Sequence, residues 1–264
     1  MTDDRRPIGL FDSGLGGLSV LAAMRAALPA ERFLYLADQA NAPYGDRSPE
    51  EILVRAEKLT AWLLERGAKM VVVACNTASA QALDLLRGRY PEIPFVGMEP
   101  AVKPAAAQSR TKVIGVLATT GTLNAHRFAS LVVRHAAGVK VVERACPGLA
   151  DMVERGECDG PEAEKLVRRF VEPVLAAGAD TLVLGCTHYT FLATVVRQVA
   201  GPGVEVIDPC GAVAAQATRV LQSVGAAPAT DIGDAQYFTT ADPQLLSHAL
   251  ARLVGQVSVE HAAC

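Results

Sequence analysis

The chain has 264 residues and a mass of 27.7 kDa, and 50% of its residues are hydrophobic while 20% are charged. This composition is typical of a globular protein with one large or two small domains, and it excludes an intrinsically disordered chain. The net charge of -3 argues against a strongly basic surface for nucleic acids and against a polybasic membrane anchor.

The cysteine pattern and the apolar runs indicate in which compartment of the cell the protein is expected. Six cysteines stand at positions 75, 146, 158, 186, 210 and 264, and no two of them form a C-x-x-C pair. We therefore expect reduced thiols in a cytoplasmic protein, with no disulfide framework and no metal site. No window approaches the length of a membrane span, and the charged residues 1–7 lack the apolar stretch of a secretory leader.

Apolar runs alternate with longer amphipathic stretches in the first third of the chain. Strands are predicted at 8–11, 33–37 and 70–74, and helices at 18–28, 49–66 and from just after Thr77 to about Arg87. Ser48 is a predicted N-cap of the second helix and Gly67 its stop. This alternation of strand and helix predicts a parallel sheet covered by helices.

The same pattern then restarts. Strands are predicted at 113–117, 140–143, 181–184 and 204–207, with helices after Thr122, at 161–177 and after His188. Residues 8–11 align with 114–117, and residues 73–77 align with 184–188. The match predicts two similar α/β halves that face each other, with residues 99–110 as the crossing between them. Chance similarity between ordinary βα units is the alternative interpretation.

Cys75 and Cys186 occupy matching places in the two halves. Each follows an apolar strand and precedes small polar residues and a predicted helix. Ligands of parallel sheets collect beyond the carboxyl ends of the strands, and a helix N-terminus favours a thiolate. Simple burial of a free thiol is the alternative for either cysteine alone. The other four cysteines have no matching mate and are interpreted as structural, with Cys264 expected to fray.

The glycine-rich residues 12–17 (DSGLGG) admit three interpretations. One is a dinucleotide-binding loop with Asp38 as the ribose-binding acid, although Ser19 replaces the third glycine. Another is a carboxylate and a hydroxyl beside backbone N–H groups that bind an anion. The third is a tight turn in which Asp12 caps the next helix.

Two equivalent thiols at a shared cleft suggest proton exchange by two bases. One thiolate removes a proton from a carbon, and the other thiol protonates the opposite face, which inverts a stereocentre. An amino-acid Cα–H is a far weaker acid than a thiol, so the site must stabilise the developing charge. His188, two residues after Cys186, could tune that thiol or relay its proton.

The sequence resembles the cofactor-independent glutamate racemases over nearly the whole chain. Six ordered motifs carry the resemblance: residues 11–17 (FDSGLGG), 43–45 (PYG), 74–78 (ACNTA), Cys146-Pro147 with Glu154, 185–189 (GCTHY) and 238–243 (FTTADP). The resemblance implies interconversion of L- and D-glutamate for peptidoglycan, cell-wall biogenesis and cell shape, without pyridoxal phosphate, any other cofactor or a metal.

The resemblance also implies a fold. Two similar parallel-sheet α/β domains are expected to be related by pseudo-twofold symmetry, with the active site in the cleft between them. Residues 1–98 and 208–264 are expected to form the first domain, and residues 99–207 the second. Glutamate is the expected small-molecule partner, a homodimer is the expected assembly, and neither nucleic acid nor membrane is expected to bind.

The resemblance also implies roles for individual residues. Cys75 is expected to take the proton from D-glutamate with help from Asp12, and Cys186 from L-glutamate with help from His188. Glu154 matches a further acid on the second side. Positions that hold the carboxylates and ammonium of the substrate match Asp12, Ser13, Pro43, Tyr44, Gly45, Asn76, Thr77, Thr119, Thr187 and His188.

The sequence departs from the family pattern at two places, and three alternative functions remain open. Thr190 stands where the family usually has proline, and residues 208–211 (DPCG) differ from the commoner serine-glycine loop; both concern loop shape. The rivals are a racemase or isomerase for aspartate, a hydantoin or another small acid, a two-lobed amino-acid binding protein, and a nicotinamide-dependent dehydrogenase.

Overall fold

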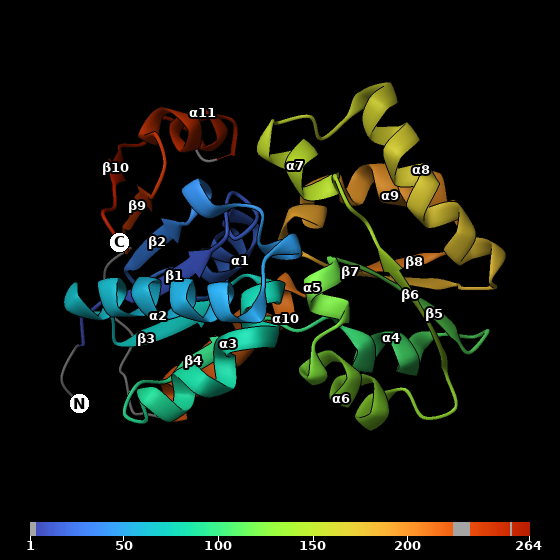
Figure 1. Cartoon of the computed structure of the whole chain (residues 1–264), viewed down its shortest axis with the longest axis horizontal. Helices are drawn as coiled ribbons and strands as arrows, with labels where there is room; N and C mark the ends of the chain where they lie inside the picture. Colours follow the sequence, from blue (N-terminus) through green and yellow to red (C-terminus); the bar gives the residue numbers. More distant parts are fainter. Residues whose placement is uncertain (1–3, 224–232, 254) are drawn as a thin grey trace.

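The computed structural model describes residues 4–223, 233–253 and 255–264. Part of the charged start on which the absence of a leader was predicted, and several residues assigned to the first domain, lie outside the described residues. Two parallel sheets form separate lobes of the molecule (Figure 1). This confirms the predicted α/β class with two parallel-sheet halves.

The first lobe is built on a six-stranded sheet with the order β10-β9-β2-β1-β3-β4. Its strands are β1 (Ile8–Asp12), β2 (Phe33–Ala37), β3 (Met70–Val73), β4 (Phe95–Gly97), β9 (Ala235–Thr239) and β10 (Val259–His261). Its helices are α1 (Leu18–Ala27), α2 (Pro49–Glu65), α3 (Asn76–Arg89), α10 (Cys210–Ser223) and α11 (Pro243–Leu253), with short 3₁₀ turns η1 (Gln39–Asn41) and η2 (Tyr44–Asp46).

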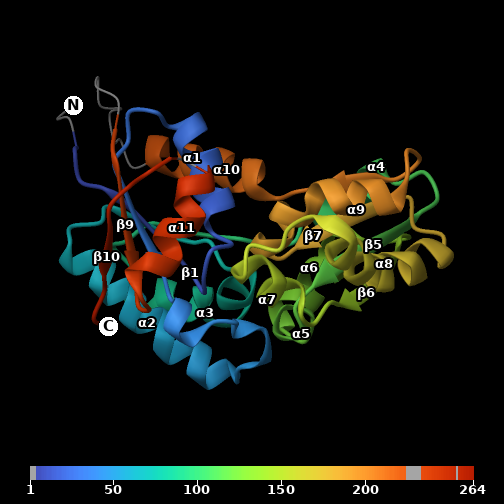
Figure 2. The same cartoon turned by 90° about the horizontal axis from the view of Figure 1, so that it is seen from above.

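The second lobe is built on a four-stranded sheet with the order β6-β5-β7-β8. Its strands are β5 (Val113–Ala118), β6 (Lys140–Ala145), β7 (Thr181–Gly185) and β8 (Glu205–Ile207). Its helices are α4 (Val102–Gln108), α5 (Thr120–Leu123), α6 (His126–His135), α7 (Leu149–Glu154), α8 (Gly160–Ala176) and α9 (Ala193–Ala200), with the 3₁₀ helix η3 (Thr187–Leu192). Figure 2 shows the two lobes from above.

The duplication predicted from the sequence is visible in the strand order. The order β2-β1-β3-β4 in the first lobe has its counterpart in β6-β5-β7-β8 in the second. β3 and β7, which precede Cys75 and Cys186, therefore hold equivalent places beside the strands β1 and β5. The predicted domain limits near residues 98 and 207 stay a prediction.

Both faces of each sheet are covered, which explains why the strands read as continuous apolar runs. In β1, Ile8 and Leu10 pack on one side of the sheet and Phe11 on the other. The helices α1 and α10 pack against each other on the first side, while α2 and α3 pack against each other on the second. Burial on both sides fixes the carboxyl ends of the strands, where the candidate site lies.

Several local predictions can be compared with the structure. Ser48 caps α2 in a capping box with Glu51, as predicted. The expected crossing of residues 99–110 contains the helix α4, because Val102 and Ala105 are apolar at helical spacing and pack on the second sheet. Cys264 does not fray, since its carbonyl oxygen accepts a hydrogen bond of 3.1 Å from the Arg55 guanidinium.

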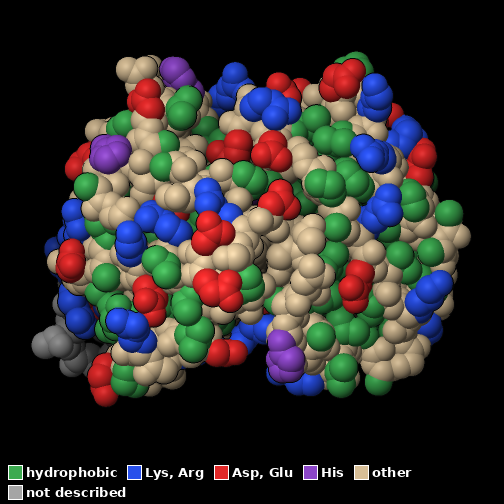
Figure 3. Space-filling view, in the orientation of Figure 1, with side chains coloured by type: hydrophobic (Ala, Val, Ile, Leu, Met, Phe, Trp, Pro, Cys, Tyr) green, Lys and Arg blue, Asp and Glu red, His purple; other side chains and the backbone are tan. Residues whose placement is uncertain are grey.

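The surface and the cysteines agree with the composition. Basic and acidic side chains are interspersed over the face shown in Figure 3. All six cysteines are free. Within the described part of the chain, no helix is long and apolar enough to cross a bilayer, and no three His, Cys, Asp or Glu side chains are grouped to hold a metal ion.

Candidate active site

Cys75 lies two residues after the end of β3 and forms the N-cap of α3. Its buried thiol accepts a hydrogen bond from the Ala78 amide at 3.4 Å and lies 3.8 Å from the Ser13 hydroxyl. Burial, with the charge of Asp12, raises the pKa of Cys75 to about 12. The Ala78 amide lowers that pKa as the helix N-terminus was expected to do, but burial outweighs it. The prediction that this position favours a thiolate is therefore wrong for Cys75.

Cys186 lies directly after β7, at the equivalent place in the second lobe. The 3₁₀ helix η3 follows it before α9 begins, whereas the sequence predicted one helix that starts after His188. Its sulfur lies 3.8 Å from Nδ1 of His188, and Nε2 of His188 lies 2.6 Å from Oε1 of Glu154. The thiol, the imidazole and the carboxylate thus form a continuous chain.

Protonation of His188 is governed by these two partners. Burial disfavours its charge, but the hydrogen bonds and charges of Cys186 and Glu154 outweigh burial and raise its pKa well above the usual value. In Glu154, burial acts to raise the pKa, and the hydrogen bond and charge of His188 lower it further than burial raises it. The pair therefore favours an imidazolium beside a carboxylate.

Asp12 connects the two sides of the site. Its Oδ1 accepts the Gly14 amide at 2.9 Å, and its Oδ2 accepts the Thr187 hydroxyl at 3.1 Å. Burial raises the pKa of this fully buried carboxyl, while the charge of His188 opposes the shift. Asp12 thus contacts the second lobe through Thr187, and its charge raises the pKa of Cys75 in the first lobe.

The glycine-rich loop after β1 packs against the second lobe. A Cβ added at Gly14 would overlap the Glu154 carboxylate, and one at Gly16 would overlap the side chains of Thr187 and His188. The helix α1 begins at Leu18 without a side-chain cap, so the helix-capping interpretation of Asp12 is wrong. These glycines permit close approach between the lobes rather than to a dinucleotide.

On the Cys75 side of the site, a cluster of threonines joins the two lobes. Thr77 lies 2.9 Å from Thr119 and 3.3 Å from Thr122, measured between hydroxyl oxygens. Gly45 packs against Thr119 at a distance that a Cβ would make tight. The predicted residues Gly45, Thr77 and Thr119 are therefore brought together.

Asn76 is the unexplained polar group of the site. It is the first residue of α3, it is 2% exposed, and neither atom of its amide group has a hydrogen-bond partner. Burying an amide without partners costs about 1–3 kcal/mol. An amide left in this state beside Cys75 points to a ligand that completes its hydrogen bonds.

The loop of residues 38–45 is held from behind by a buried ion pair. The Asp38 carboxylate accepts the Tyr44 hydroxyl and pairs with Arg55 at 2.7 Å. Asp38 is thus committed inside the first lobe, which removes the ribose-binding acid that a dinucleotide loop requires. The Tyr44 phenol faces Asp38, and Pro43 forms the N-cap of η2, so this loop offers its backbone to the site.

Three polar residues that bridge or support the site were missed by sequence reasoning. Gln39 donates to Glu154 at 3.1 Å and accepts from Thr239 at 2.9 Å. Gln81 donates to the Gly121 carbonyl at 3.0 Å. Thr239 falls in the motif at 238–243, and Gln39 follows Asp38, but nothing in their spacing indicated a contact with the second lobe.

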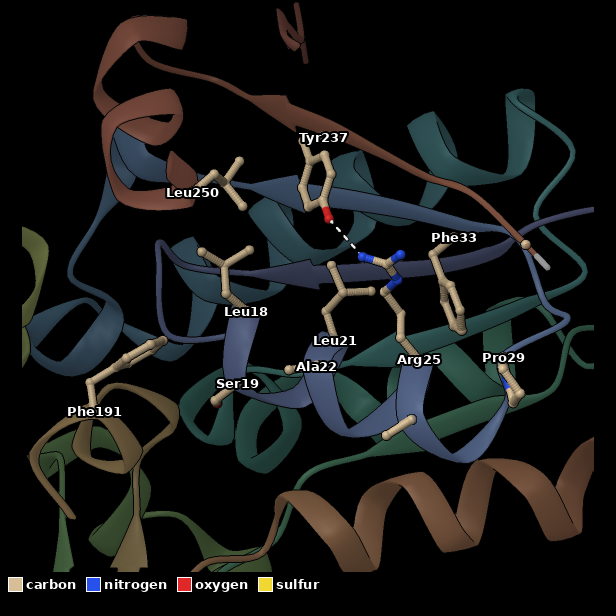
Figure 4. A pocket seen from close by; sticks show the side chains of 12 residues that line it. Leu18, Ser19, Leu21, Ala22, Arg25, Pro29, Phe33, Phe191, Tyr237 and Leu250 are labelled. Atoms are coloured by element: carbon tan, nitrogen blue, oxygen red, sulfur yellow. Dashed lines mark hydrogen bonds between the residues drawn. The ribbon is translucent and has the colours of Figure 1, made fainter. Parts of the chain in front are cut away.

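A separate cavity of about 470 Å³ lies along α1 of the first lobe, with Phe191 of η3 in the second lobe also in its lining. Its lining is mainly apolar, and Figure 4 shows the Arg25 guanidinium beside Leu21 and Phe33, where it donates to the Tyr237 hydroxyl at 3.5 Å. No predicted site residue is among the described residues that line it. The chemistry-bearing groups are therefore those between the lobes.

A family model for the Asp/Glu/hydantoin racemases matches residues 8–217. This chain belongs to that racemase family. It is 50% identical to the glutamate racemase of Roseiflexus sp. (strain RS-1) over 250 residues, which cover 94% of this chain and 92% of the relative. It is also 46% identical to the glutamate racemase of Pseudomonas aeruginosa over 97% of this chain and 96% of the relative.

Solved structures of glutamate racemases share the fold. A glutamate racemase isoform from Bacillus anthracis superposes with a TM-score of 0.90 at 32% identity, over 98% of this chain and 97% of that one. The Escherichia coli enzyme, solved with L-glutamate and an activator, gives a TM-score of 0.85 at 32% identity over 98% of both chains.

The two sequence departures from this racemase family lie against each other. The Thr190 hydroxyl is 3.8 Å from the Cys210 sulfur, which is 3.4 Å from the Ser19 hydroxyl. Both replacements thus belong to one contact between η3, α10 and α1.

Proposed function

We propose that this racemase interconverts L- and D-glutamate by two-thiol proton transfer at the α carbon. The single observation that carries the mechanism is the equivalent placement of Cys75 and Cys186. Both thiols lie at the carboxyl ends of matching strands, buried where the lobes meet, and close enough for Cys186 to influence the pKa of Cys75. The choice of glutamate is supported by the relatives, which are named glutamate racemases.

From L-glutamate, the Cys186 thiolate removes the Cα proton and becomes a thiol. The Cys75 thiol then gives its proton to the opposite face of the carbanion, which yields D-glutamate and a Cys75 thiolate. The reverse reaction begins at Cys75. No electron is transferred. Conversion of L- to D-glutamate leaves Cys186 protonated and Cys75 as the thiolate, and the reverse reaction restores the first state.

The neighbours of each thiol suit these starting states. The imidazolium of His188, held by Glu154, stabilises the negative charge of a Cys186 thiolate. The raised pKa of Cys75 keeps it protonated when it must act as an acid. The raised pKa of Asp12 allows that carboxyl to accept a proton from Cys75 when the thiolate is required.

Substrate binding is assigned to the polar groups around the thiols. The uncompensated amide of Asn76 is available to a substrate carboxylate, together with the hydroxyls and backbone groups of Ser13, Tyr44, Gly45, Thr77, Thr119 and Thr187. Donors aimed at the α-carboxylate would stabilise the charge that develops when the Cα proton leaves.

Proton NMR in D₂O tests the proposal. Purified protein with L-glutamate and no added cofactor should lose the Cα–H signal, while chiral analysis detects D-glutamate. Exchange with aspartate or another acid but not with glutamate would move the substrate and keep the thiols. Absence of exchange with every acid would overturn the two-thiol assignment and favour a binding protein.

The biological setting follows from the product. We propose that the D-glutamate supplies peptidoglycan synthesis in the cytoplasm, which agrees with the reduced state of all six cysteines. The homodimer stays a prediction, and light scattering of the purified protein checks it.

A further inference from the structure

We propose that Gln39 and Thr239 form a positioning relay that holds Glu154 in place for proton transfer at Cys186. The proposal rests on the proposed function, and neither residue touches a reacting atom. The relay links the end of β9 in the first lobe to the carboxylate at the end of α7 in the second. It assigns to the C-terminal part of the chain a role in one of the two proton transfers.

The geometry of Glu154 shows why it needs a second anchor. Its Oε1 accepts both the Leu15 amide at 2.6 Å and His188 Nε2 at 2.6 Å. Its Oε2 accepts Gln39 Nε2 at 3.1 Å. If Glu154 were held only through Oε1, its carboxylate group could rotate about that atom. The hydrogen bond from Gln39 to Oε2 prevents this rotation and so fixes the orientation of the carboxylate relative to the His188 imidazole.

Gln39 is in turn oriented by Thr239. The Thr239 hydroxyl donates to Gln39 Oε1 at 2.9 Å, which turns the amide so that its NH₂ group faces Glu154. Thr239 is fully buried, and its backbone pairs with Ala37 of β2 and His261 of β10. The relay therefore starts from a side chain that the sheet holds on both sides.

The relay ends on the group that governs Cys186. With Nε2 of His188 committed to Glu154, Nδ1 faces the Cys186 sulfur at 3.8 Å. A carboxylate that drifts would loosen the imidazole and misplace Nδ1. Cys75 makes its contacts elsewhere, with Ser13 and the Ala78 amide, so loss of the relay should impair one thiol more than the other.

The test compares Gln39→Leu, which keeps the size of the side chain and removes its hydrogen bonds, with Gln81→Leu. Gln81 also donates a hydrogen bond across the lobes, to the Gly121 carbonyl, but on the Cys75 side. Loss of a hydrogen bond to a charged group costs roughly a factor of ten or more in an equilibrium constant, and we expect Gln39→Leu to lower kcat/KM by about tenfold through the displaced Glu154. Because the enantiomers are equally stable, the loss must be the same in both directions, and a second readout is required.

Primary isotope effects supply that readout. Slower transfer at Cys186 should increase the effect measured with α-deuterated L-glutamate and decrease the effect measured with α-deuterated D-glutamate. Gln81→Leu should leave the ratio of the two effects unchanged or move it the other way. Unchanged kcat/KM in Gln39→Leu, or an unchanged ratio of the isotope effects, would overturn the proposal.

Thr239 provides a rescue experiment. Thr239→Val removes the donor and should reproduce the changed isotope ratio, whereas Thr239→Ser keeps the hydroxyl and should restore the ratio of the unaltered protein. A ratio in Thr239→Val equal to that of the unaltered protein would show that the hydroxyl is not needed, and a change in Thr239→Ser alone would show that Thr239 acts by packing; either result would contradict the relay.

A measurement without substrate separates the relay from the proposed function. ¹⁵N NMR of the imidazole, assigned with His188→Asn, should show that Gln39→Leu lowers the pKa of His188 while Gln81→Leu does not. Identical titrations in the unaltered protein and Gln39→Leu would overturn the relay. If the titration shifts but the unaltered protein does not racemise glutamate, the proposed function fails and the positioning of Glu154 stands.

Discussion

At the scale of single residues, burial and hydrogen-bonded partners act in opposite directions on the groups of the site. Burial dominates at Cys75 and raises its pKa to about 12. At His188 the adjoining thiol and carboxylate outweigh burial. The two thiols are therefore equivalent in the fold and unlike in their surroundings, which suits an enzyme that starts one direction from an acid and a base of different kinds.

Replacing either thiol tests the roles of the two cysteines. Serine is nearly isosteric with cysteine, but its hydroxyl is a far weaker acid. We expect Cys75→Ser and Cys186→Ser each to lower racemisation by about a thousandfold or more, as measured by chiral analysis in both directions. A single variant that keeps full turnover in both directions would exclude the two-base mechanism.

The buried amide of Asn76 leads to a prediction of opposite effects on stability and activity. Asn76→Leu removes an amide whose atoms have no partner, so it should raise the free energy of unfolding by about 1 kcal/mol. The same change should lower kcat/KM at least tenfold, because a substrate carboxylate loses a donor. Urea unfolding and steady-state kinetics on the same preparation measure both effects.

Thr60→Val is the matched control for that experiment. Thr60 also carries a buried hydroxyl without a partner, but it lies in α2 among core side chains. It should raise stability by about the same amount and leave kcat/KM unchanged. Equal kinetic losses in the two variants would remove Asn76 from the binding site.

At the scale of elements, the glycine-rich loop sets how closely the lobes approach. Gly16→Ala should push this loop away from η3, because the new methyl group would overlap Thr187 and His188. A displacement of about 1 Å between catalytic groups costs roughly a hundredfold in rate. We expect kcat/KM to fall by about that factor while circular dichroism still reports a folded protein.

Gly88→Ala separates this effect from a general effect of the substitution. Gly88 lies in α3 with open space around it. Alanine in a helix interior is better by about 0.5–1 kcal/mol, so this variant should be more stable and fully active. Full activity in Gly16→Ala would show that the two lobes meet elsewhere during turnover.

The elements that the sequence predicted are those with long apolar periodicity. The bounds of β1, β2 and β3 were predicted to within a residue, because burial of both sheet faces makes these strands continuous apolar runs. The start of α2 was predicted from its N-cap, Ser48. β4 and β10 have three residues each and were not predicted, whereas β8, which is equally short, was predicted at 204–207. Cys75 and Cys186 could be identified from the sequence because each lies in a motif. Gln39 could not, because it is a single polar residue whose role depends on contacts with Glu154 and Thr239, which lie in distant parts of the chain.

At the scale of the whole molecule, the site exists only where the two lobes meet. Hydrogen bonds join the two lobes on both sides of the thiols. Leu15 and Gln39 donate to Glu154, Thr187 donates to Asp12, Gln81 donates to the Gly121 carbonyl, and the hydroxyls of Thr77 and Thr119 bond to each other. Each thiol makes its nearest contacts within its own lobe, Cys75 with Ser13 and Ala78 and Cys186 with His188. Separation of the lobes would therefore break the contacts that join the two thiol clusters. Such a contact set suits a substrate that enters and leaves by movement of one lobe against the other.

Burial of several thiols makes the stability of the whole fold sensitive to alkali. The pKa values of Cys75, Cys146 and Cys210 are each raised to about 12, chiefly by burial. In the unfolded chain these thiols titrate near pH 8.5. Above that pH the unfolded state binds fewer protons than the folded state, so the free energy of unfolding must fall as pH rises toward 12.

The expected slope makes the prediction quantitative. Each such thiol lowers the free energy of unfolding by up to about 1.4 kcal/mol per pH unit. Urea unfolding between pH 9 and 10 under reducing conditions measures the combined effect of the thiols, below the pH at which ionisation of tyrosines becomes the larger contribution. Cys210→Ala removes one titrating group and should reduce the slope by about one such increment. A slope equal to that of the unaltered protein would mean that Cys210 ionises within the fold, and stability that stays constant over this range would contradict the burial of all three thiols.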